Sequence, residues 1–313
     1  MTAALDFLRN NTIYALIAIL FVFVAGIEIA RPGTVTPLWI SNMILFAAPL
    51  AILGAGQTMV MLTGGIDLSV ASVATGAAYL LATNATSGDV TAISIALSLG
   101  LAVGVVNGIG VALLRVQPLI MTLGTGLMCA GVMIVYSQQM MASQPHVPAI
   151  IQFLGSAKVM GLVPVNLFLW VVIGGLVLFV LHRTGYGRLL YAIGDNRDAC
   201  HLAGIRVWRV VFVDYVVCAV LAAVAGLVLV GGTNASDLSL ANAYLLPSVA
   251  CVIIGGTSIF GGRGGYAGTI VGALILTVLT SLLTLLEVHE PTKQILYGLI
   301  ILLLAAAYAR LTE

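Results

Sequence analysis

Long apolar runs follow one another along almost the whole chain of 313 residues, and each is about as long as a lipid bilayer is thick. A helix needs about 20 apolar residues to cross the hydrocarbon core, and its backbone polar groups must bond within the protein because lipid offers them no partners. Windows of this length predict spans at 12–30, 39–63, 66–83, 91–113, 118–140, 164–182, 207–231, 244–260, 264–286 and 292–310. We therefore predict an all-α, polytopic membrane protein with about 10 transmembrane helices.

Composition agrees with a membrane protein. The chain is 61% hydrophobic and 7% charged, whereas a typical soluble domain carries about 25% charged residues. Glycines interrupt the second, third and eighth predicted spans, so a count of about nine or about eleven stays open. No connection in the sequence is long enough to form an independent module, and residues 1–313 are predicted to form a single domain.

Basic residues are shared unevenly between the two sides of the predicted bundle. With the N-terminus inside, the inner side holds Arg9, Arg115, Arg183, Arg188, Arg197, Arg206, Arg209, Arg263 and Arg310. The outer side holds only Arg31, Lys158 and Lys293. Because cytoplasmic loops carry the excess of Lys and Arg, we predict that both termini and residues 182–209 are cytoplasmic.

The longest polar interruption is this segment, HRTGYGRLLYAIGDNRDACHLAGIRVWR, which holds five of the twelve Lys and Arg residues. Asn196 is a good helix N-cap, Asp198 suits a first turn, and Gly204 can supply the left-handed residue after the last turn. These signals predict a helix of about two turns, which is too short to persist in water without packing. Its small apolar face would fit a shallow groove on a partner and consists of Ala199, Leu202 and Ala203. An ordered connector between two spans is the alternative.

Two glycine-rich breaks interrupt the apolar sequence, LTGGIDLS at 62–69 and IGGTSIFGGRGG at 254–265. Asp67 lies in the first break, between two apolar spans. A charge at the bilayer centre costs about 2.5–3.5 kcal/mol on insertion scales, so the carboxylate should face donors or water. It can cap the next helix through the backbone amides of Ser69 or Val70, or it can act directly at a substrate site or gate.

Neutral polar residues within the spans indicate what could cross the membrane. A route for cations would need acidic rings, and a proton relay would need a chain of Asp, Glu or His. The groups present instead suit an uncharged polyol, although each one alone could form an interhelical hydrogen bond. The predicted pathway residues are Asn42, Gln57, Thr58, Thr63, Asp67, Ser69 and Asn107.

The sequence has no motif by which this chain could power transport with ATP. No GxxxxGK[ST] phosphate-binding loop occurs, and neither lysine follows a glycine. The four cysteines form no CxxC pair, and no Ser/His/Asp or metal-ligand cluster indicates an enzyme. A net charge of +1 gives no reason to expect nucleic acid as a partner. Energy for transport must therefore come from another subunit or, as the alternative, from an ion gradient that drives a secondary transporter of a polyol.

Three motifs, in the right order, resemble those of the permease subunits of ribose-type sugar ABC importers, the family of ribose, xylose, galactose and autoinducer-2 permeases. The motifs are GAGQTMVMLTGGIDLSVASVATGAA at 54–78, GRLLYAIGDNRDACHLAGIRVWR at 187–209 and CVIIGGTSIFGGRGGYAGTIVGALIL at 251–276. Together they are far more specific than any one of them. The chain departs from the usual pattern at Asp195 and Arg197, where a small residue and an acidic residue are more common.

The resemblance implies a permease that carries a neutral sugar or sugar-like molecule across the bacterial inner membrane by alternating access. It also implies a second permease chain, identical or homologous, a periplasmic sugar-binding protein, surrounding membrane lipid, and a cytoplasmic ATPase. The ATPase would bind the ATP and Mg, so that this chain needs no cofactor or metal of its own. Residues 196–204 would form the cytoplasmic coupling helix, and the first motif would lie by the pathway. The implied coupling residues are Arg188, Gly194, Asp195, Asn196, Arg197, Asp198, Ala199, Leu202 and Gly204.

Overall fold

The computed structural model describes residues 12–139 and 146–312, and almost all of the regular structure is helical. The helices are α2 (Thr12–Ala30), α3 (Pro37–Leu62), α4 (Val70–Asn84), α5 (Asp89–Gly108), α6 (Pro118–Gln139), α7 (Ala149–Ser156), α8 (Val165–Arg183), α9 (Gly185–Asp195), α10 (Arg197–Leu202), α11 (Val207–Thr233), α12 (Leu245–Ile254), α13 (Tyr266–Leu285) and α14 (Glu290–Thr312). The short elements are 3-10 helices at Ala85–Ser87 and Asn242–Tyr244, a π-helix at Ile109–Leu113, and the antiparallel strands β1 (Lys158–Val159) and β2 (Val163–Pro164). The all-α prediction is confirmed, while Arg9 lies outside the described residues.

Seven of the described helices are long and apolar enough to cross a membrane, namely α2, α3, α5, α6, α8, α11 and α13. Helices α4 and α12 have only 15 and 10 residues, so the predicted count of about 10 spans is not confirmed. The glycine breaks shorten both helices. Gly64 and Gly256 have φ angles of +77° and +88°, a region that only glycine adopts without strain. The third predicted span therefore starts at Val70 instead of 66, and the eighth ends at Ile254 instead of 260.

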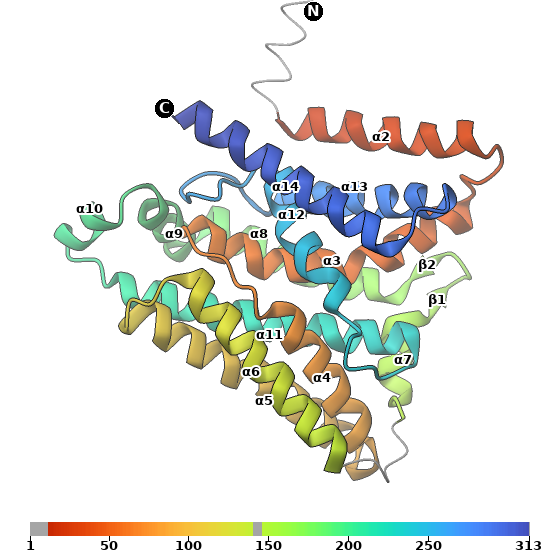
Figure 1. Ribbon diagram of the computed structural model, residues 1–313, viewed down its shortest axis with the longest axis horizontal. Coiled ribbons are helices and arrows are strands. Elements are labelled where there is room, and N and C mark those ends of the chain that lie inside the picture. Colours follow the sequence, from red (N-terminus) through yellow and green to blue (C-terminus); the bar gives the residue numbers. More distant parts are fainter. Residues whose placement is uncertain (1–11, 140–145, 313) are drawn as a thin grey trace, which may run out of the picture.

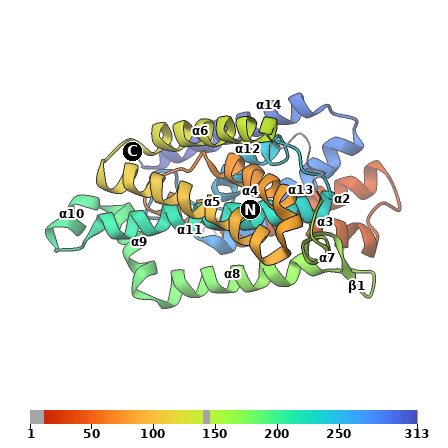
Figure 2. The same ribbon diagram turned by 90° about the horizontal axis from the view of Figure 1, so that it is seen from below.

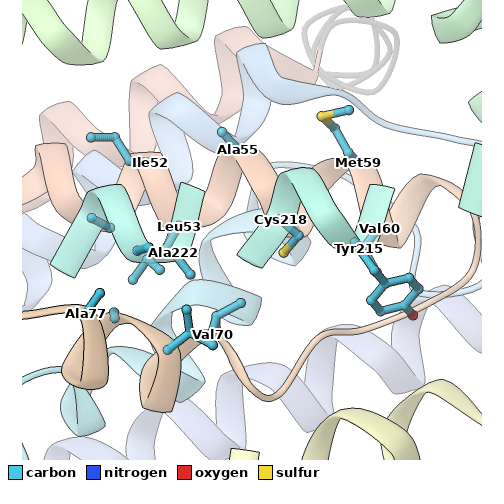
Figure 3. Packing of buried hydrophobic residues seen from close by; sticks show 14 of the residues in the cluster. Ile52, Leu53, Ala55, Met59, Val60, Val70, Ala77, Tyr215, Cys218 and Ala222 are labelled. Atoms are coloured by element: carbon cyan, nitrogen blue, oxygen red, sulfur yellow. The ribbon is translucent and has the colours of Figure 1, made fainter. Parts of the chain in front are cut away.

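The core of the bundle is built around α3 and α11. Every residue of α3 from Ala47 to Leu62 is buried, and α11 packs against α3, α4 and α5. Figure 3 shows part of this apolar cluster, to which α3 contributes Ile52, Leu53, Ala55, Met59 and Val60, α4 contributes Val70 and Ala77, and α11 contributes Tyr215, Cys218 and Ala222. A second cluster joins α3 to α12 and α13. Helix α3 thus belongs to both parts of the core and connects them.

Glycines determine how closely these helices approach, since lipid gives no hydrophobic drive for helices to associate. A Cβ atom built on Gly100 or Gly104 of α5 would lie 2.7 Å from the backbone of α11. A Cβ atom on Gly268 or Gly272 of α13 would overlap the backbone of α12 and the glycine that follows it. Larger residues at these positions would push the helices apart.

The two ends of the bundle differ in structure. Figure 1 shows α9 and α10 at the left end, whereas α7, β1 and β2 lie at the right end. Figure 2 shows α8 along one side of the bundle and α6 along the opposite side. Arg115 and Arg197 line one surface hollow next to α10, as expected for two residues on the same side of a membrane.

Candidate functional site

The polar segment between α8 and α11 folds into α9 and α10. Asn196 caps α10, because its Oδ1 accepts a hydrogen bond of 2.9 Å from the backbone N–H of Ala199. Gly204 has a φ of +78° and follows the last turn, where the N–H of Ile205 donates to the carbonyl of Cys200 at 3.0 Å. The predicted helix between Asn196 and Gly204 is confirmed as α10, whereas α9 has no counterpart among the predicted helices.

Helix α10 presents most of its side chains to the outside. Its one buried residue is Cys200, while Leu202 is 91% exposed and Ala199 and Ala203 are exposed. The exposed polar residues of the segment include Arg188, Asp195, Asn196, Arg197 and Asp198. The surface therefore offers an apolar contact surrounded by charged groups, which suits docking of a second protein.

Helix α9 is held against the bundle by two tyrosines. The hydroxyl of Tyr186 donates to Oδ1 of Asp214 on α11 at 2.8 Å, and the hydroxyl of Tyr191 donates to the carbonyl of Gly264 at 3.0 Å. Burial, together with the neighbouring Asp214 carboxylate, raises the pKa of Tyr186 above its ordinary value, so the phenol keeps the proton that it donates. Burial also raises the pKa of Tyr191. Helix α9 is thereby bonded to α11 and to the second glycine break.

The two glycine breaks and the end of α9 meet in a contact between backbones. The N–H of Gly262 donates to the carbonyl of Leu62 at 3.0 Å. Gly194 lies against both groups, and a Cβ atom there would overlap the Leu62 oxygen and the Gly262 nitrogen. A Cβ atom on Gly261 would lie 2.9 Å from the nitrogen of Gly64. We call this contact of Leu62, Gly64, Gly194, Gly261 and Gly262 the glycine junction.

Asp67 is fully buried and organises the turn between α3 and α4. Its Oδ1 accepts hydrogen bonds from the backbone N–H of Ser69 at 2.8 Å and from the Ser69 hydroxyl at 2.6 Å. The side-chain amide of Gln57 donates to the Asp67 carbonyl at 2.5 Å and accepts from the Asp67 N–H at 3.2 Å. The predicted contact with the Ser69 amide is present, but Ser69 itself is the N-cap of α4, so Asp67 does not cap that helix and instead fixes the turn before it.

The same network reaches α5 and α6. Asn107 donates from Nδ2 to the Ser69 hydroxyl at 2.9 Å and accepts from the Thr125 hydroxyl at 2.6 Å. Gln57, Asp67, Ser69 and Asn107 have no exposed surface. The structure thus brings four of the predicted pathway residues together, bonded to one another within the bundle.

The other three predicted pathway residues lie apart from this network. Thr58 bonds to the hydroxyl of Thr269 on α13 at 2.8 Å, and Thr63 donates to the carbonyl of Val60 at the end of α3. Asn42 accepts a hydrogen bond from Lys158 at the opposite end of the bundle.

Asp214 is a buried carboxylate that the sequence prediction missed, although it lies within the apolar run VWRVVFVDYVV at 207–217. An ionisable residue inside such a run is itself a signal of function, because charged groups in the membrane interior are costly. Within the described part of the chain, Oδ2 of Asp214, Oδ2 of Asp67 and the Tyr215 hydroxyl are buried without a hydrogen-bond partner. No group of three or more His, Cys, Asp or Glu among the described residues could hold a metal ion.

Replacing Asn196 with alanine is expected to loosen α10 without unfolding the bundle. Loss of an N-cap costs about 1 kcal/mol, so the Ala199 amide should exchange with solvent about fivefold faster. Asn196→Ser keeps a capping oxygen and should exchange at the native rate. Hydrogen–deuterium exchange of residues 196–204 measures both variants, and equal rates in the alanine and serine variants would show that the cap does not stabilise this helix.

The family described as branched-chain amino acid transport system, permease component, has a model that matches residues 39–305. The ribose import permease protein of Escherichia coli strain K12 is 34% identical over 293 residues, covering 92% of this chain and 91% of that protein. The fructose import permease protein of Rhizobium meliloti is 32% identical over 267 residues, covering 83% and 74%. The autoinducer 2 import system permease protein of Escherichia coli O157:H7 is 30% identical over 306 residues, covering 95% and 87%. No solved structure matches the chain.

Proposed function

Because this chain belongs to the ribose-type permease family of ABC importers, we propose that it carries a neutral sugar or sugar-like molecule by alternating access, driven by ATP hydrolysis on a partner. The chain is a permease subunit of a sugar importer and a multi-pass protein of the bacterial inner membrane. The relatives are named for the import of ribose, fructose and autoinducer 2, which are therefore the first substrates to test.

The exposed face of α10 is the observation that most supports this proposal. Its partner would be a cytoplasmic ATPase, which binds the ATP and Mg and docks on residues 196–204, with Arg188 and Gly194 at the approach. The α10 end and both termini would then lie in the cytoplasm. A second permease chain would complete the pathway, and a periplasmic sugar-binding protein would deliver substrate at the other end. Residues 1–313 would act as one transmembrane domain.

The glycine junction supports a route by which ATPase movement reaches the membrane. Gly194 is the next-to-last residue of α9, and its backbone touches Leu62 in the first break and Gly262 in the second, so displacement of α10 would shift the 62–69 and 254–265 segments together. The first break contains Asp67 and Ser69, which belong to the hydrogen-bonded network. We propose that the network keeps this moving break attached to α5 and α6. The proposed sugar pathway passes beside Asn42, Gln57, Thr58, Thr63, Asp67, Ser69 and Asn107.

Uptake by the reconstituted complex tests the proposal. Proteoliposomes containing the permease, its ATPase and its binding protein should accumulate radiolabelled ribose, fructose or autoinducer 2 only when ATP reaches the ATPase. The matched control replaces ATP with a non-hydrolysable analogue. Uptake that collapses with an uncoupler but survives without ATP would instead identify an ion-coupled secondary transporter.

Leu202→Asp is expected to weaken ATPase binding at least tenfold. Burying a leucine side chain contributes about 1.5–3 kcal/mol, and a carboxylate cannot replace that contact. Met160→Asp is the matched control, because Met160 is 95% exposed and lies in the β1–β2 turn at the opposite end. Co-purification of the ATPase with each variant measures the effect. Equal recovery with both variants would mean that α10 is not the docking site.

A further inference from the structure

A cavity of about 710 Å³ lies between α2, α3, α12, α13 and α14, and the segments that lead into α3 and into α12 complete its lining. Its residues on α13 come from the second half of that helix, far from the glycine junction, and its residues on α14 come from the first half. The cavity therefore belongs to the end of the bundle opposite α10, and we call it the outer cavity. Its volume is within the range of small-molecule sites in proteins.

One side of the outer cavity is a row of hydroxyl groups on α13. The row consists of Thr277, Thr280, Ser281 and Thr284, whose spacing places them on one face of the helix. The three threonine hydroxyls donate to carbonyls of the preceding turn at 2.7–2.8 Å, so their oxygens still have lone pairs that can accept hydrogen bonds. The Ser281 hydroxyl has no hydrogen-bond partner among the described residues and is half-buried.

Aromatic side chains also line the outer cavity. Trp39 comes from α3, Tyr244 from the turn before α12, and Tyr297 from α14. The Tyr297 hydroxyl lies 2.6 Å from that of Thr280, whereas the Trp39 indole N–H and the Tyr244 hydroxyl have no hydrogen-bond partner in the described part of the chain. Each of these two residues thus combines an apolar ring with an unused polar group.

The charges at the outer cavity favour a neutral ligand. Arg31 and Glu290 both line it, and Lys293 pairs with Glu290 at 3.2 Å and donates to Thr284 at 2.9 Å. No cluster of one sign would attract an ion. The outer cavity offers hydroxyl oxygens that accept hydrogen bonds, a hydroxyl and an N–H that donate them, and apolar ring faces. This set matches a sugar, which has hydroxyls around its ring and C–H groups on its faces. An acyl chain of a lipid would leave these polar groups unpaired.

We propose that the outer cavity is a sugar-binding site of this permease, in which Ser281, Trp39 and Tyr244 hold the substrate on the outer half of its path. This inference rests on the proposed function, because it takes the transported sugar as the ligand. The buried network around Asp67 has its hydrogen bonds largely satisfied within the bundle, while the outer cavity offers groups that are free to bind.

Substrate kinetics test the binding role. In proteoliposomes of the complete transporter, Ser281→Ala and Trp39→Leu are each expected to raise the KM for radiolabelled ribose and fructose about three- to tenfold, as loss of one binding contact does. ATP hydrolysis in the absence of sugar should stay within about twofold of wild type, because the cavity is far from α10. Ser98→Ala is the matched control, since this exposed serine lies on α5 away from the cavity. Unchanged KM values in both cavity variants would overturn the inference. Absence of ATP-driven uptake by the wild-type complex would instead contradict the proposed function.

Chemical labelling tests access independently of transport. All four cysteines are buried, so a membrane-impermeant methanethiosulfonate should react in whole cells mainly with an introduced thiol. Ser281→Cys should be labelled from outside and protected at least about threefold by saturating ribose or fructose, whereas Met160→Cys should be labelled without protection. Failure to label Ser281→Cys while Met160→Cys reacts would overturn the inference. Labelling of purified Ser281→Cys permease that is blocked by added lipid, or by the second permease chain, and not by sugar would assign the cavity to that occupant instead.

Discussion

Gly194→Val is expected to abolish most transport while leaving the permease inserted and bound to its ATPase. Any Cβ atom at Gly194 overlaps the Leu62 carbonyl and the Gly262 nitrogen, so the backbones of the glycine junction must separate. Overpacking of this kind costs about 1–3 kcal/mol or more. Since the exposed face of α10 is untouched, the ATPase should still dock. Sugar uptake and sugar-stimulated ATP hydrolysis should both fall at least tenfold, because about 1.4 kcal/mol corresponds to a factor of ten.

The control for this variant is Gly185→Ala in the same helix. A Cβ atom at Gly185 has one neighbour, the end of the Arg188 side chain at 3.7 Å, which is an ordinary contact. Gly194→Ala adds only the Cβ atom, so its rate of sugar uptake should lie between that of the control and that of the valine variant. Size-exclusion profiles and ATPase recovery identify misfolded protein. Uptake by well-folded Gly194→Val at the rate of Gly185→Ala would contradict a role for the junction in transmission.

Asp67→Ala is expected to be the most destabilising of the side-chain changes in the network. It leaves the backbone N–H and the hydroxyl of Ser69 without their acceptor in a site that has no exposed surface. Each stranded buried group costs about 1–3 kcal/mol, so a loss of about 3 kcal/mol is expected. Because all four cysteines are buried, a thiol-reactive fluorophore that becomes bright on labelling reports the unfolding temperature of the purified permease.

Asp67→Asn separates the structural role of Asp67 from a role of its charge. The amide oxygen can still accept from Ser69, so this variant should lose less than half of the stability that Asp67→Ala loses. Ser69→Ala, which removes one donor and leaves the carboxylate, is a second control. If Asp67→Asn is stable but transports no sugar, the carboxylate acts directly on substrate or at a gate, and the purely structural role is wrong.

Features that act within a few residues were predictable from the sequence. The cap at Asn196 and the left-handed Gly204 are confirmed because each depends on the turn next to it. The Asp67–Ser69 contact is confirmed for the same reason. Helix α9 was missed although Tyr186, Leu190 and Ile193 recur at helical spacing, which was a usable signal. The partners of its tyrosines, on α11 and in the second break, could not be read from that pattern.

Features that join distant segments could not be read from one chain. The contact of Gly194 with Leu62 and Gly262 depends on three segments far apart in the sequence. A glycine in the sequence does not show which distant residue it contacts. The outer cavity is assembled from five helices and two connecting segments, so its hydroxyl row is visible in the sequence only as serines and threonines in an apolar helix. Asp214 is the exception, because its position within an apolar run was a usable signal.

The glycine junction contains main-chain atoms where most helix contacts contain side chains. Side chains absorb small displacements by changing rotamer, which makes an ordinary interface compliant. The glycine junction has no side-chain torsions that could change in this way. A small shift of α9 must therefore displace the backbones of Leu62 and Gly262 by nearly the same distance. Few substitutions fit at the glycine junction. Residue changes that adapt the permease to a new ATPase or a new sugar are therefore expected on the exposed surface of α10 and in the lining of the outer cavity.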